Sequence, residues 1–218
     1  MFIGHFAVGF GAKRFAPRVS LGTLFLACQL ADIVWPVLVL AGIETFEIAP
    51  GITAVTPLDF TSYPYSHSLV ALTIWAAAFA LVFRTAGNAG GRAAIVLAIV
   101  VLSHWVLDVA THRPDMPVLL HGGPLLGLGL WYSLPATMIV ESALFAIGIA
   151  IYARATRARD RIGRLAPWGL VGFLYLAYVA ALFGPPPPSV AAVAWSDMGQ
   201  WLLVGWAYWV DRHRERTA

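Results

Sequence analysis

The sequence predicts an all-α membrane protein, a polytopic helical bundle of about six transmembrane helices preceded by a short N-terminal half-helix. Composition and the length of the apolar runs both point to this class. Of the 218 residues, 60% are hydrophobic and only 11% are charged, with a mean hydropathy of +0.76. A soluble domain usually carries about 25% charged residues. We therefore expect lipid to be the solvent for most of the surface.

Six apolar runs approach the length of about 20 residues that crosses a bilayer core. Before them lies a shorter apolar stretch, residues 2–12, which we expect to be a half-helix packed inside the bundle. Together these segments predict a single integral membrane domain over residues 1–218. The expected spans are 19–43, 67–84, 93–111, 125–153, 167–184 and 190–210.

The basic residues predict an orientation. In the six-span arrangement every Lys and Arg except Arg113 falls on one side of the membrane. Positive charge is retained in the cytoplasm during insertion, so both termini are expected to be cytoplasmic. The net charge of +3 comes from these short clusters, which argues against nucleic-acid binding. The single cysteine, Cys28, has no intrachain partner for a disulfide.

The outer segment 44–66 is expected to be irregular. It contains Pro50, Pro57 and Pro64, and proline interrupts regular helices. Long ordered loops often act as lids or binding elements. The other proline-rich outer segment, residues 185–188, is better explained as a stiff turn between the last two spans.

Polar residues that are energetically unfavourable inside a membrane interrupt the apolar runs, and they lie at a similar depth in the expected bilayer. Asp32 lies inside the first run, and His104 and Asp108 are four residues apart in the third, which places them on one helix face. At about 1.5 Å of rise per residue from the nearest cytoplasmic charge, these residues share a layer near the outer end. The same count adds His67 and Glu141 to the layer, places Asp197 there less clearly, and adds His5 if the half-helix is tilted.

Imidazoles mixed with carboxylates are typical ligands of zinc, manganese or ferrous iron. We therefore interpret His5, Asp32, His67, His104 and Asp108 as ligands of one or two divalent ions, zinc first. The layer could instead relay protons or a cation, or it could lock the helices together, and Glu141 could simply pair with a protonated histidine. His112 and His121 are more typical of solvated loop residues.

Several short motifs in the first half of the chain, taken in order, resemble the YdjM-like family of membrane-bound proteins classed as metal-dependent hydrolases. They are His5 followed by small residues, Ala31-Asp32, Ser66-His67-Ser68, and His104-x-x-x-Asp108. The family is in turn distantly similar to the helical zinc-dependent phospholipase C and nuclease fold. The resemblance implies phosphoester hydrolysis by bound metal ions, and a place in a bacterial inner (plasma) membrane.

This chain departs from the family pattern at two points. Asp32 is followed by Ile-Val-Trp and lacks a second acid two residues on, and the segment before His67 lacks an arginine. Without that arginine, a bidentate clamp on a phosphate is less well supported.

These features lead to a hydrolase hypothesis. The expected activity is metal-dependent cleavage of an ester or phosphoester in a lipid-like substrate near the outer leaflet, with Asp32 or Glu141 as general base if that residue is not a metal ligand. The lipid bilayer is the expected partner. The alternatives are a small ion-coupled transporter and a non-catalytic membrane protein. A transporter predicts polar residues in the cytoplasmic half as well, where residues 74–83 and 93–101 are wholly apolar.

Overall fold

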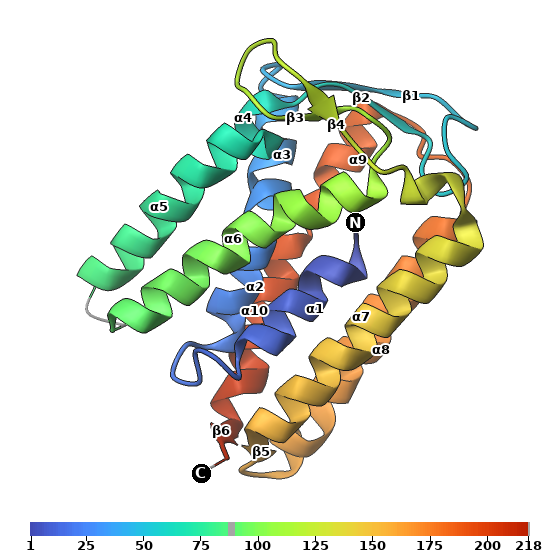
Figure 1. Ribbon diagram of the computed structural model, residues 1–218. Coiled ribbons are helices and arrows are strands. Elements are labelled where there is room, and N and C mark those ends of the chain that lie inside the picture. Colours follow the sequence, from blue (N-terminus) through green and yellow to red (C-terminus); the bar gives the residue numbers. More distant parts are fainter. Residues whose placement is uncertain (87–89, 218) are drawn as a thin grey trace.

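The computed structural model describes residues 1–86 and 90–217, and it is mostly helical, with 65% of residues in helices (Figure 1). The described helices pack side by side as a bundle, as the all-α prediction expected. They are α1 (Ile3–Ala12), α2 (Leu21–Cys28), α3 (Leu30–Leu40), α4 (Pro64–His67), α5 (Leu69–Thr85), α6 (Gly91–Thr111), the short 3-10 helix η1 (Leu130–Tyr132), α7 (Leu134–Ala155), α8 (Arg161–Phe183), α9 (Val190–Asp197) and α10 (Gln200–Arg212).

Three small antiparallel sheets add to the helices. In the segment expected to be irregular, β1 (Thr45–Ile48) pairs with β2 (Leu58–Ser62). Next to it, β3 (Met116–Pro117) pairs with β4 (Leu125–Leu126), so both sheets form a cap at one end of the bundle (Figure 1). At the other end, β5 (Thr156–Ala158) pairs with β6 (Arg214–Arg216). The all-α prediction missed these strands, since short strand pairs joined by long loops leave little periodicity.

Six full-length spans are too many for this structure. Three helices, α6, α7 and α8, are long and apolar enough to cross a membrane, and a fourth span exists if the bent pair α2 and α3 is counted as one. That pair bends by 55° at Gln29. The expected span 67–84 begins only at Leu69, because Ser68 caps the helix, and the span 190–210 is divided between α9 and α10.

Helix α1 lies within the range 2–12 expected for the half-helix, and it runs through the middle of the bundle (Figure 1). Ile3, Phe6 and Phe10 are fully buried. Gly148 of α7 permits the close packing, because a Cβ there would meet the backbone of Ala7. Large apolar side chains instead face outward from the long helices, as lipid contact requires; they include Ile95, Ile99, Val106, Ile139, Ile147 and Leu176.

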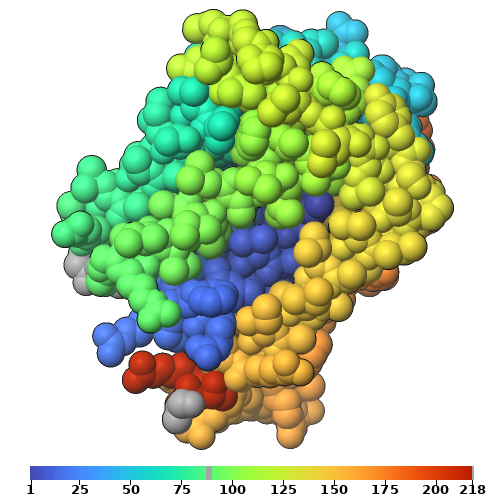
Figure 2. All heavy atoms as spheres, viewed as in Figure 1, coloured from blue at the N-terminus to red at the C-terminus, as the bar shows by residue number. Residues whose placement is uncertain are grey.

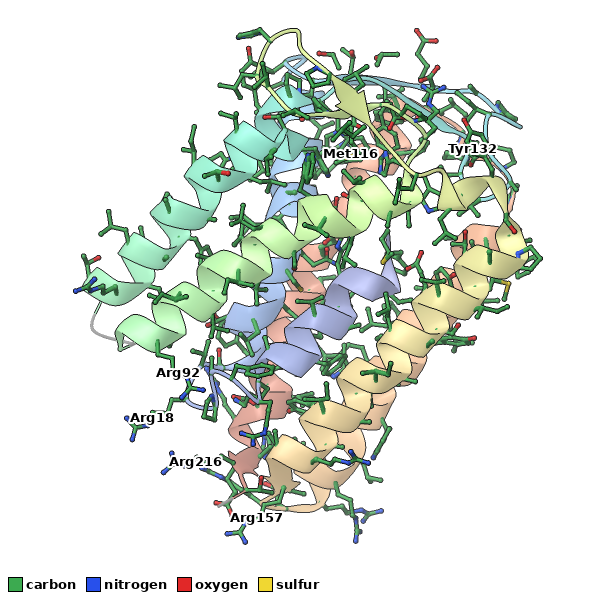
Figure 3. All side chains as sticks on the ribbon, viewed as in Figure 1. Arg18, Arg92, Met116, Tyr132, Arg157 and Arg216 are labelled. Atoms are coloured by element: carbon green, nitrogen blue, oxygen red, sulfur yellow. The ribbon has the colours of Figure 1, made fainter. Side chains whose placement is uncertain are left out.

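Buried apolar residues form two clusters, one around α1 in the middle of the bundle and one under the cap. Below the polar layer, α1 is surrounded by aromatic rings, with Phe25 on Phe6 and on Phe10, and Phe145 and Tyr152 beside Phe10. The second cluster anchors the cap; it contains Trp35, Val39, Phe46, Tyr63, Met116 and Ala194. Figure 3 shows Arg18, Arg92, Arg157 and Arg216 at the end opposite to Met116 and Tyr132.

Candidate metal centre

Five histidine and aspartate side chains converge where α1, α3, α4 and α6 meet. The ligand atoms of His5, His104 and Asp108 lie within 4.8 Å of one another, and so do those of Asp32, His67 and His104. Each group could hold a metal ion. These are the five residues that the sequence suggested as ligands, and the structure brings all of them together.

His104 is the member that both groups share. Its Nε2 lies 3.1 Å from Asp108 Oδ2, one turn further along α6, and 3.4 Å from Asp32 Oδ1. Its Nδ1 lies 2.8 Å from the carbonyl oxygen of Cys28. Cys28 ends α2, where helix carbonyls lack an intrahelical partner. Because a carbonyl only accepts hydrogen bonds, Nδ1 of His104 carries a proton, and in the neutral ring the lone pair of Nε2 faces the two carboxylates.

His67 is oriented by a chain of hydrogen bonds that begins at Glu44. The Glu44 carboxylate accepts bonds from the Tyr65 and Ser66 amides at 2.7 and 2.9 Å, and from the Ser66 hydroxyl at 2.6 Å. A carboxylate only accepts, so the Ser66 proton points to Glu44. Ser66 Oγ, 2.7 Å from His67 Nδ1, must then accept the Nδ1 proton. In the neutral ring the lone pair of His67 Nε2 therefore faces Asp32 Oδ1, 3.2 Å away.

His5 completes the first group from α1. Its Nε2 lies 3.0 Å from Asp108 Oδ1, and its ring is stacked on His104 with centroids 3.7 Å apart. The amino group of Met1 also donates to Asp108 Oδ1, at 2.6 Å. The position of the helix depends on Glu141, whose Oε2 accepts from the backbone amides of Phe2 and Gly4 at 2.9 and 3.1 Å. Glu141 thus satisfies the free amides at the start of α1 and lies outside both groups.

The distances and the proton positions fit a cation. Ligand atoms about 2 Å from one ion in a tetrahedral arrangement are about 3.3 Å apart, close to the 3.1 to 3.4 Å between the histidine nitrogens and carboxylate oxygens. Neutral imidazole lone pairs that face carboxylates repel them unless a metal ion or a proton lies between. In the described chain, His104 Nε2 and His5 Nδ1 are buried without a hydrogen-bond partner.

The cluster is reached from one edge only. The side chain of Asp32 is 25% exposed, whereas those of His5, His67, His104 and Asp108 are at most 6% exposed. Beside Asp32 lies the start of α10, where the Gln200 amide is 3.5 Å from the Asp32 carbonyl oxygen. Asp32 is therefore the first member of the cluster that a small molecule would meet.

Two further histidines differ in their surroundings. His112 is buried rather than solvated, contrary to the sequence expectation; its Nδ1 lies 3.0 Å from Asp115 Oδ1, and its ring packs 4.2 Å from Trp131. Burial lowers the pKa of His112. His121 is exposed, as expected. Sequence reasoning missed Glu44 and Ser66, although the Ser-His pair at 66–67 was a signal for a serine partner of His67.

The fold and the site define a mostly helical protein with membrane-length apolar helices and a buried cluster of histidine and aspartate residues that could hold a metal ion. No family model, curated protein or solved structure matches the chain. The family resemblance therefore stays a hypothesis, and the case for a function depends on the chemistry of the cluster.

Proposed function

We propose that this protein is a membrane-embedded, metal-dependent hydrolase that cleaves an ester or phosphoester of a lipid-like substrate near the outer leaflet. The observation that carries the proposal is the convergence of His5, Asp32, His67, His104 and Asp108 from four helices. Charged groups at this depth in a membrane protein are costly, and they usually mark a functional site.

The donor set favours one ion, with zinc as the first choice and manganese or iron as alternatives. Both groups use His104, and its Nδ1 is already bonded to Cys28. Only Nε2 of that ring is left, and one lone pair serves one ion. When bound, the ion would lower the pKa of water and polarise the scissile carbonyl or phosphoryl group.

Within this proposal the acidic residues take different roles. Asp32, at the open edge, is placed to accept a proton from water as general base. One oxygen of Glu141 is committed to the amides of Phe2 and Gly4. Glu141 is therefore better explained as a positioning residue that holds α1, and through it His5, against α6.

The surroundings favour an amphiphilic substrate. The cap, built from β1 to β4, covers one end of the bundle (Figure 1), and the long helices carry outward-facing apolar side chains that suit contact with lipid. A substrate with an acyl chain can leave that chain in the bilayer while its polar linkage reaches Asp32. The aromatic packing of Phe6, Phe10 and Phe25 closes the other side of the layer.

An ion-coupled transporter is the second candidate, because two discontinuous helices meet beside the cluster. Helices α2 and α3 bend at Gln29, α9 and α10 are separated by Met198 and Gly199, and Gln200 contacts Asp32. Transporters often bind ions at such breaks. The aromatic packing below the layer favours a site open to one side, and thus the hydrolase.

Metal content tests the proposal directly. We expect about one equivalent of zinc, manganese or iron in purified wild-type protein by inductively coupled plasma mass spectrometry, and almost none in the double variant His104→Ala, Asp108→Ala. The matched control is Glu47→Ala with His121→Ala, which removes one acid and one histidine that are exposed on the cap. Equal, substoichiometric metal in all three proteins would refute a metal centre.

Turnover is the second measurement. Wild-type protein should cleave a fluorogenic ester or phosphoester lipid analogue in mixed micelles. The rate of cleavage should fall after chelation of the metal and recover when the metal is restored. If the protein contains metal but cleaves neither class of analogue, the metal centre is supported and the hydrolase proposal is rejected.

A further inference from the structure

A cavity of about 680 Å³ opens at the end of the molecule opposite to the cap. Three segments that are distant in the sequence meet there: the α1–α2 connection, the α7–α8 connection with β5, and the tail with β6 (Figures 2 and 3). Seven lysine or arginine side chains and two carboxylates line it. The excess of positive charge makes this a different kind of site from the metal centre.

Part of this charge is already committed within the protein. Lys13 pairs with Asp211 at 2.8 Å, and Arg157 and Arg159 both pair with Glu215, at 2.7 and 3.6 Å. The Arg214 guanidinium donates to backbone and side-chain oxygens of neighbouring residues. Within residues 1–86 and 90–217, the other three arginines of the wall have no ion pair or side-chain hydrogen bond: Arg18, Arg212 and Arg216.

Orientation in the membrane explains the presence of basic residues but not their arrangement. Retention in the cytoplasm depends on the number of positive charges near the helix ends. Here the tail is also fixed to the α7–α8 connection by a sheet, in which Arg157 is opposite Glu215 and Ala158 is opposite Arg214. Arg159 and His213 extend the pairing through a backbone hydrogen bond of 3.0 Å. Several guanidinium groups held around one cavity repel one another, and a bound anion would offset this unfavourable electrostatic energy.

We propose that this cavity binds a phosphate-bearing anion, with Arg18, Arg212 and Arg216 as its principal contacts. Guanidinium groups suit phosphate because they donate two parallel hydrogen bonds. The cavity lies where α7 and α10 end, at Ala155 and Arg212, and therefore at the level of lipid headgroups. Basic pockets at this level bind anionic headgroups. An anionic phospholipid is the favoured source of the phosphate, and a soluble polyphosphate is the other source.

Binding to the full-length protein in neutral detergent tests the proposal. The probes are short-chain phosphatidylglycerol, short-chain phosphatidylcholine and inorganic pyrophosphate, with dissociation constants from thermophoresis. The variant Arg18→Gln, Arg212→Gln removes two uncommitted contacts. The control Arg84→Gln, Arg92→Gln removes equal charge from exposed positions that do not line the cavity.

We expect phosphatidylglycerol to bind well and phosphatidylcholine poorly. With about 1 kcal/mol for each basic residue near a charged surface, the Arg18, Arg212 variant should bind about 30-fold more weakly, and the control should bind like wild type. Glu215→Gln should bind more tightly, because it frees Arg157 and Arg159, and misfolding does not produce such a gain. If pyrophosphate binds and phosphatidylglycerol does not, the phosphate comes from a soluble source.

Three results would overturn the site. They are equal binding of both lipids without binding of pyrophosphate, equal loss in the two double variants, and unchanged or weaker binding in Glu215→Gln. Metal content and hydrolysis are independent of these measurements.

Discussion

The hydroxyl of Ser66 lies 2.6 Å from the carboxylate of Glu44, and this contact determines which nitrogen of the neighbouring His67 is free to bind a metal ion. Glu44 comes from the cap and is 1% exposed. The cap therefore takes part in the candidate metal centre through a residue that touches no member of either group of possible ligands.

Glu44→Gln should weaken metal binding about 10- to 100-fold, as changes behind a metal ligand typically do. The glutamine oxygen can still accept from the Tyr65 and Ser66 amides, while its NH₂ group donates to Ser66. The Ser66 hydroxyl then donates to His67 Nδ1, and the proton of His67 moves to Nε2. Competition with a chelator measures the affinity, and the visible spectrum of the cobalt form reports the coordination. Glu47→Gln, at an exposed position of β1, the strand that begins just after Glu44, is the control. Wild-type affinity in a folded Glu44→Gln protein would refute this relay.

Asp32→Asn should separate hydrolysis from transport. The change keeps the size of the side chain but removes its ability to take up a proton, so we expect hydrolytic turnover to fall by about 10² to 10⁴. Proteoliposomes should show no ion flux with either protein. Flux in wild type that disappears with Asp32→Asn would instead identify the transporter.

Gly148→Ala should lower the stability of the bundle by about 1–3 kcal/mol, because the added methyl group meets the backbone of Ala7. Since α1 carries His5, metal affinity should fall as well. Unfolding by denaturant in detergent measures the first effect and chelator competition the second. Gly172→Ala is the control: its Cβ would meet no atom within 4 Å, and alanine is the better helix former. Equal loss from both substitutions would contradict the proposed role of Gly148 in packing.

The cap should lose stability in acid through Asp115. Burial raises the pKa of this carboxyl, but hydrogen bonds from His112 and Arg113 lower it, and the net pKa is below the ordinary value. A group with a lowered pKa stabilises the folded state above its unfolded pKa of about 4, and this contribution is lost as the pH falls through the folded value. Hydrogen exchange of cap amides at pH 7 and at decreasing pH should show the loss in wild type. In Asp115→Asn the cap amides should be less protected from exchange at pH 7, and their protection should change less below pH 4. If the protection of the variant and of wild type falls in parallel with pH, Asp115 is not the group responsible.

The candidate site was easier to predict than the full topology. The spacing of His104 and Asp108 on one helix and the common depth of Asp32 and His67 are local properties, readable from 1.5 Å of rise per residue. The convergence of their side chains depends in addition on how the helices pack against one another, which is not a local property.

The breaks in the helices were not readable in the same way. Glutamine does not usually break a helix, yet α2 ends just before Gln29. The Cys28 carbonyl oxygen that this break leaves free accepts a hydrogen bond from His104, which is 76 residues away in the sequence. The partnership of Glu44 with Ser66 and the pairing of β5 with β6 likewise join distant segments. Such contacts are decided by tertiary packing, which overrides local preference.

The central place of α1 sets an order of assembly during synthesis. His5 is translated before α7, which follows more than a hundred residues later, yet its helix is packed against α7. A nascent chain that has inserted only through α6 has no Gly148 surface to receive α1 and no Glu141 to hold its amides. The cluster can thus close only after α7 has been translated.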